Sequence, residues 1–188
     1  MTAKKKLYGP STLAEHDELL KQEGRYEEML ERQRQREEEA KRIAAELERA
    51  EQPILKDLRA VGINVERVWG LLSLERPYPE AIPILLEHLQ KPYPDRVLEA
   101  IGRALGVPEA REHWDFLVER FKVAPNDTNA KMGLGDALQL IAGIDKSLLD
   151  DIIALVRDPA QGPDRLMLIP VLSKSRDPRA YETLVEMR

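Results

Sequence analysis

Two distant stretches of the chain repeat one pattern: Pro79-Glu80-Ala81-Ile82-Pro83-Ile84-Leu85-Leu86 and Pro178-Arg179-Ala180-Tyr181-Glu182-Thr183-Leu184-Val185. In both, a proline and an alanine come before a large side chain, and two adjacent aliphatic residues end the stretch. Pro108-Glu109-Ala110 opens a third copy, and a weaker fourth copy starts at Lys146. A period of roughly 30 to 40 residues is typical of stacked helix pairs, because one pair is too small to bury its own apolar stripe. The sequence therefore predicts a helical repeat domain.

Proline also divides the chain. Residues 11–52 contain none, and prolines recur from Pro53 onward. Because proline is tolerated in the first turn of a helix but not in its interior, one long helical region should be followed by many short helices. We predict an all-α protein with a disordered basic tail over residues 1–10, a long helical arm over 11–52 and a repeat domain over 53–188. In the repeat domain the expected helices are 53–61, 65–74, 79–90, 94–106, 108–122, 128–142, 146–157, 163–174 and 178–187.

Short polar residues and glycines mark the expected ends of these helices. Asn64 and Asp127 stand where N-caps are expected, because their side chains can accept hydrogen bonds from the first turn. Gly62, Gly106 and Gly143 stand where helices should stop. The connections between these signals are short, so neighbouring helices should be antiparallel.

The arm over 11–52 should begin with Ser11 or Thr12 as its N-cap, and Glu15 stands three residues after Thr12, as in a capping box. Gly24 should weaken or kink the arm. Its central stretch, residues 31–42, has good helix formers and pairs of opposite charge, but only an alanine to bury. We therefore expect a solvated helix that bridges two contacts. The alternative is a coiled-coil arm that forms a homodimer, although a sustained heptad of apolar residues is missing.

Several motifs of the repeat domain resemble the HEAT repeat family, particularly its short bacterial branch. Asp177-Pro178-Arg179-Ala180 and Ala81-Ile82-Pro83 fit the family's first helix, and Ala100-Ile101-Gly102-Arg103-Ala104-Leu105-Gly106 fits the end of its second helix. The resemblance covers roughly residues 77–188 and departs from the family at Glu112, which replaces the proline one turn into the helix. It implies a short α–α superhelix, a HEAT-like solenoid.

The resemblance also implies that the second helices line a concave face that binds a partner protein. On the helix expected over 94–106, the residues left off the apolar stripe are Arg96, Glu99 and Arg103. The corresponding faces of later helices would add Lys131, Asp136, Gln139 and Arg165. Arg96 and Arg165 each follow an aspartate, so an alternative for them is a structural ladder of Asp–Arg contacts between repeats.

Small and aromatic residues indicate how the helices pack. Close approach of neighbouring second helices should be permitted by the small residues Ala100, Gly102, Gly133 and Gly135. Trp69 and Trp114 should pack in the core, and either one would be a binding hot spot if it lay exposed on the concave side.

The sequence shows no catalytic, cofactor or metal signature. It has no cysteine, and His16, His88 and His113 fall on three separate expected helices without the spacing of metal ligands. The serines and acidic pairs are explained by caps and solvated faces. We therefore expect a protein that is not an enzyme and that uses no cofactor or metal.

Charge and hydropathy limit the partners. The formal net charge of −5 and a pI near 5.4 argue against nucleic acid and anionic membrane. No run of ~18 to 20 apolar residues is present, and no apolar run follows the N-terminal lysines, so we expect neither a membrane span nor a signal peptide. A cytoplasmic protein is the expectation.

Three functions remain in competition. The first is a protein-binding adaptor or inhibitor, because a rigid stack offers a large preformed surface. The second is an enzyme like those of a HEAT-like family that excises alkylated bases from DNA, which would need a basic concave channel. The third is an assembly component that self-associates through the arm.

Overall fold

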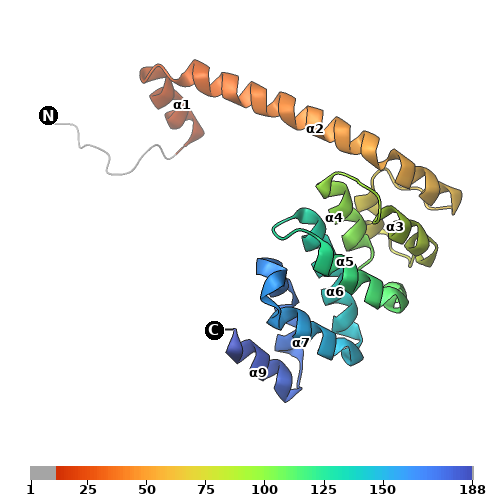
Figure 1. Ribbon diagram of the computed structural model, residues 1–188. Coiled ribbons are helices and arrows are strands. Elements are labelled where there is room, and N and C mark those ends of the chain that lie inside the picture. Colours follow the sequence, from red (N-terminus) through yellow and green to blue (C-terminus); the bar gives the residue numbers. More distant parts are fainter. Residues whose placement is uncertain (1–11, 188) are drawn as a thin grey trace. The chain divides into compact units, whose positions relative to one another are not determined.

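The computed structural model describes residues 12–187, and every regular element in that range is a helix (Figure 1). This confirms the all-α prediction for that range. The tail predicted over residues 1–10 lies outside the described residues. The chain divides into two compact units, and the boundary falls between Glu46 and Leu47.

The first unit contains helix α1 (Leu13–Gln22) and the beginning of helix α2 (Tyr26–Ala60). The Oγ1 atom of Thr12 accepts a hydrogen bond from the backbone N–H of Glu15 at 3.2 Å, so Thr12, one of the two predicted N-caps, caps α1. Gly24 has a φ of +70° between the two helices. A positive φ is readily adopted by glycine, which explains why the chain breaks there.

The long helix α2 is exposed in its middle and buried at its end. Side chains from residues 31 to 46 are exposed, and ion pairs such as Arg42–Glu39 at 2.7 Å link successive turns. The helix continues through Pro53, so the separate helix predicted over 53–61 is wrong. Ile54 and Leu58 are fully buried directly after the proline. Their burial, at about 1.5–3 kcal/mol each, offsets the ~3 kcal/mol that an interior proline costs.

The second unit combines α-helices with short 3₁₀ helices, labelled η. Three of the four predicted repeat starts, at 79, 108 and 146, begin with a 3₁₀ turn and continue as an α-helix. The fourth, at 178, begins directly as an α-helix. The elements are η1 (Val68–Ser73), η2 (Pro79–Ala81), α3 (Ile82–His88), α4 (Asp95–Ala104), η3 (Pro108–His113), α5 (Trp114–Val123), α6 (Asn129–Ile144), η4 (Lys146–Leu148), α7 (Leu149–Arg157), η5 (Pro159–Leu168), α8 (Ile169–Lys174) and α9 (Pro178–Glu186).

The helix predicted over 65–74 is present only as the 3₁₀ helix η1, and Asn64 does not cap it. The cap comes from Glu51 of α2 instead, whose Oε2 accepts the backbone N–H of Val68 at 3.0 Å. Arg67 donates to both oxygens of the same carboxylate, at 3.0 and 2.9 Å. Glu51 is only 1% exposed, so a buried charge with three donors fixes the start of η1.

Two of the other predicted helix ends need correction. Thr128, not Asp127, caps α6, and Asp127 takes a φ of +59° just before it. Gly143 lies inside α6 instead of ending it. Gly62, with a φ of +83°, follows the end of α2 as predicted, and Gly106 follows the end of α4.

One apolar core runs through the second unit. η1 packs on α4, α4 on α6, α6 on α5 and η5, and α7 on η5, α8 and α9. Each element therefore contacts mainly its near neighbours in sequence. Trp114 is 2% exposed in this core, as predicted, and its indole N–H donates to Asp151 at 2.8 Å.

Candidate functional site

The candidate site lies where α4 and α6 pack closely together. A Cβ atom on Gly102 would lie 2.8 Å from the carbonyl carbon of Gly133, and one on Gly133 would lie 2.9 Å from the Cα of Glu99. Both distances are well below ordinary contact, so only glycine fits at these two positions. The predicted close approach is confirmed for this pair of glycines.

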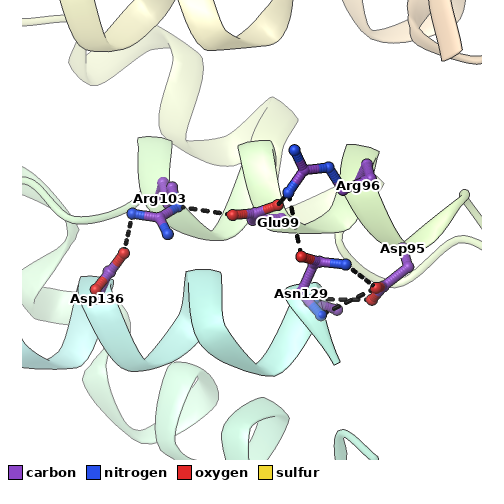
Figure 2. Close-up of polar contacts among 7 residues, drawn as sticks. Asp95, Arg96, Glu99, Arg103, Asn129 and Asp136 are labelled. Carbon is purple, nitrogen blue, oxygen red and sulfur yellow. Dashed lines mark hydrogen bonds and ion pairs between the residues drawn. The ribbon is translucent and has the colours of Figure 1, made fainter. Parts of the chain in front are cut away.

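Asp95, the first residue of α4, caps the neighbouring helix α6 (Figure 2). Its carboxylate accepts the backbone N–H groups of Asn129 at 2.9 Å and Ala130 at 2.8 Å, and the side-chain amide of Asn129 at 2.6 Å. Burial opposes the charge, but these donors and the nearby Arg96 lower the pKa of Asp95. The equivalent Asp164 likewise accepts a backbone N–H, that of Asp127, at 2.9 Å. The two aspartates thus accept backbone N–H groups, and neither forms an ion pair with an arginine among residues 12–187, so the Asp–Arg ladder considered for these positions is not formed there.

The carboxylate of Glu99 fixes the positions of the two arginines of α4. Its side chain is 3% exposed and accepts hydrogen bonds from Arg96 Nη1 at 2.7 Å and Arg103 Nε at 3.1 Å (Figure 2). Arg96 also donates to Asn129 Oδ1 at 3.1 Å. The expectation that Glu99 lies on an open face is therefore wrong, because its carboxylate is buried beneath the guanidinium groups.

Arg103 links α4 to both of its neighbours. Its Nη1 forms an ion pair with Asp136 of α6 (Figure 2), and its guanidinium lies over the Trp69 ring of η1, 5.6 Å from the ring centroid. Burial raises the pKa of Asp136, and Arg103 opposes this effect. Trp69 is 36% exposed, so the prediction that it packs in the core is wrong.

We call the group of Trp69, Arg96, Glu99, Arg103 and Asp136 the α4 polar face. Arg96 is the most exposed of its charged side chains, at 59%. Its guanidinium keeps donors available to a partner while Glu99 fixes its position. Together with the indole of Trp69, this arrangement can bind a planar or acidic group by hydrogen bonds and stacking.

Lys131 is buried and does not belong to an open face. It is 1% exposed, and its Nζ donates to Asn126 Oδ1 at 2.7 Å, Gln161 Oε1 at 3.0 Å and the carbonyl of Ala124 at 3.3 Å. The ammonium also lies 4.9 Å from the ring centroid of Phe121. Burial lowers the pKa of Lys131. The expectation that α6 offers this lysine to a partner is wrong, because it stabilises the loop before α6 and η5.

The remaining predicted site residues are Gln139 and Arg165. Among the described residues, neither forms a hydrogen bond or ion pair with the α4 polar face. Gln139 is partly exposed and lines a separate groove near the end of α6. Arg165 is half-buried on η5.

His88 is a buried side chain with two polar partners. His88 is 1% exposed, and hydrogen bonds join its Nε2 to Asp57 Oδ2 at 2.9 Å and its Nδ1 to Tyr93 Oη at 2.7 Å. It therefore packs between α2 and the segment after α3. Within residues 12–187, no group of histidine and acidic side chains has the geometry to hold a metal ion.

Comparison with known proteins gives no relative. No protein-family model matches the chain, and no curated protein and no solved structure is significantly similar to it. None of the helices in the described residues is long and apolar enough to cross a bilayer. The function is therefore inferred from the α4 polar face.

Proposed function

We propose that the chain is a non-enzymatic, cytoplasmic adaptor or inhibitor that binds another protein through the α4 polar face. The observation that supports this most directly is Trp69, which is 36% exposed beneath the guanidinium of Arg103. Tryptophan and arginine are the residues most enriched in binding hot spots. A large aromatic side chain left at the surface beside an arginine is typical of such a spot.

The buried carboxylate of Glu99 supports the same proposal. It bonds both Arg96 and Arg103, so the two guanidinium groups are already positioned before a partner arrives. Ordering a long, mobile side chain on binding costs about 0.5–1.5 kcal/mol. Since this ordering has already occurred in the free protein, more of the contact energy is available for affinity.

The architecture that we propose for this module is a short HEAT-like stack. Three of the expected repeat starts share a 3₁₀ turn followed by an α-helix, and α4 and α6 follow the first two as second helices. The contacts run mainly between neighbouring elements, as in a stack of repeats. This arrangement would place Trp69, Arg96 and Arg103 on the face of the second helices.

Affinity capture from a source lysate tests the proposal with the full chain and two variants, Trp69→Ala and Arg96→Ala. Both remove exposed side chains and leave Glu99 in place. We expect each to weaken capture of the same partners at least tenfold, or about 1.4 kcal/mol. Arg157→Ala is the matched control, because Arg157 is an exposed arginine that pairs only with Glu186 in the described contacts. Undiminished capture by both face variants would refute the proposal.

Self-association through α2 is a second candidate, supported by one observation. Ile43 is 45% exposed in a stretch of α2, residues 31–46, whose side chains are all exposed. An apolar residue at that position would be covered in a dimer of the arm. Substitution of Ile43 tests this candidate independently of the α4 polar face.

A further inference from the structure

We propose that an apolar groove at the C-terminal end of α6 binds a short, acidic, amphipathic helix of a partner protein. We call it the α6 groove. It has a volume of about 320 Å³, and its walls include Leu140 and Ile144 of α6, Pro170 and Val171 of α8, and the side chains of Lys146 and Lys174. The proposal goes beyond the α4 polar face and does not depend on it.

Two large apolar side chains in the wall of the α6 groove are exposed to solvent. Leu140 is 49% exposed and Ile144 is 66% exposed, and they lie one turn apart on the same side of α6. Apolar side chains grouped beside a groove mark an interaction site more strongly than scattered ones. A groove between helices that offers two such contacts suits a helix with apolar residues at i and i+3 or i+4.

The charge of the α6 groove selects the kind of helix. Lys146 and Lys174 are both exposed at its edge, and neither forms an ion pair with any residue that the structure describes. The adjacent Asp145 is already engaged, because hydrogen bonds from Arg111 and Ser147 lower its pKa to about 2. The groove is therefore locally positive on a chain whose net charge is −5. Acidic side chains flanking the apolar residues would complement it.

Gly143 keeps the α6 groove open. It lies inside α6, and a Cβ atom added there would meet nothing within 4 Å. Glycine inside a helix costs roughly 1 kcal/mol relative to alanine, and packing does not require it here. A glycine without a packing role suits a position where another chain approaches the backbone closely.

Selection from a displayed library of randomised 16-residue helical peptides, with the full-length chain as target, tests the proposal. We expect the selected peptides to carry Leu, Ile or Phe at i and i+3 or i+4, with Asp or Glu on either side. Gly143→Leu should weaken the dissociation constant of these peptides at least tenfold, because the new side chain fills the groove. Lys146→Glu combined with Lys174→Glu should reverse the charge preference.

Two controls separate this proposal from a change in folding and from the α4 polar face. Ala154→Leu adds similar bulk at an exposed position of α7 outside the groove and should leave peptide binding unchanged. Arg96→Ala should also leave it unchanged, whereas loss on this substitution would place the peptides on the α4 polar face and overturn the proposal. Peptides that bind Gly143→Leu as tightly as the parent chain, or a selection without acidic enrichment, would overturn it too.

Discussion

Gly133 and Gly143 lie in the same helix, α6, and the structure predicts opposite effects when each is changed to alanine. At Gly133 the new Cβ would lie 2.9 Å from the Cα and 3.0 Å from the carbonyl carbon of Glu99. These are backbone atoms of α4, so they cannot turn aside as the end of a side chain could. α4 would have to move away from α6, which also stretches the hydrogen bonds that Asp95 accepts from the first backbone N–H groups of α6.

The sizes of the opposing free-energy terms decide whether each substitution stabilises or destabilises the fold. Overpacking costs about 1–3 kcal/mol, and each strained hydrogen bond adds up to about 1 kcal/mol. Alanine returns at most about 1 kcal/mol in helix propensity. Gly133→Ala should therefore lower the free energy of unfolding by about 2–3 kcal/mol. Gly143→Ala meets nothing within 4 Å, so it should raise it by up to about 1 kcal/mol.

Thermal unfolding followed by tryptophan fluorescence measures both effects in the full-length chain. The chain has two tryptophans, Trp69 and Trp114, and both belong to the unit that contains α4 and α6. At roughly 3–5 °C per kcal/mol, Gly133→Ala should lower Tm by about 6–15 °C, and Gly143→Ala should raise it by a few degrees. Equal Tm values for Gly133→Ala and the parent chain would refute the close packing of α4 on α6.

Three further substitutions test other contacts. Lys131→Met should lower the free energy of unfolding by about 1–3 kcal/mol in urea titrations, because it leaves the buried Gln161 acceptor without its donor. Since burial lowers the pKa of Lys131, the parent chain should gain stability as pH rises towards 10.5, and Lys131→Met should not. The pKa of Asp145 is lowered from 3.8 to about 2, so its carboxylate stabilises the fold above pH 4, and this contribution disappears as the pH falls to about 2. The difference in free energy of unfolding between the parent chain and Asp145→Asn should therefore shrink over that interval. Ile43→Glu should halve the mass measured by light scattering if α2 mediates a dimer, and an unchanged monomer mass in both proteins would exclude that dimer at the concentration used.

Much of the fold could be predicted because proline and glycine act locally. Gly24 and Gly62 stand where the chain takes a positive φ, and most helices of the second unit lie close to their predicted ranges. Pro53 misled the prediction because its cost is local, whereas its compensation is not. Ile54 and Leu58 are fully buried in the apolar core of the second unit, and no local propensity reveals that burial.

The candidate site was predictable in its position but not in its interior. The spacing of Arg96, Glu99 and Arg103 placed them on one side of α4, and Glu99 does contact both arginines. Helical periodicity cannot tell which charged residue of such a set is buried, because burial depends on how closely the next helix approaches. The close contact of Gly133 with α4 sets that approach. The same packing explains why Asp95 accepts the backbone N–H of Asn129, which belongs to another helix.

The capping contacts of Asp95 have a consequence for how the chain opens. The amide hydrogens of Asn129 and Ala130 are bonded to a carboxylate of α4, not to their own helix. They can exchange with solvent deuterium only when that carboxylate leaves, so their protection factors measure the free energy of separating α4 from α6. The amide of Val68 does the same for Glu51 of α2. Two small sets of amides thus record, in the unmodified protein, whether neighbouring helices separate in succession or all together.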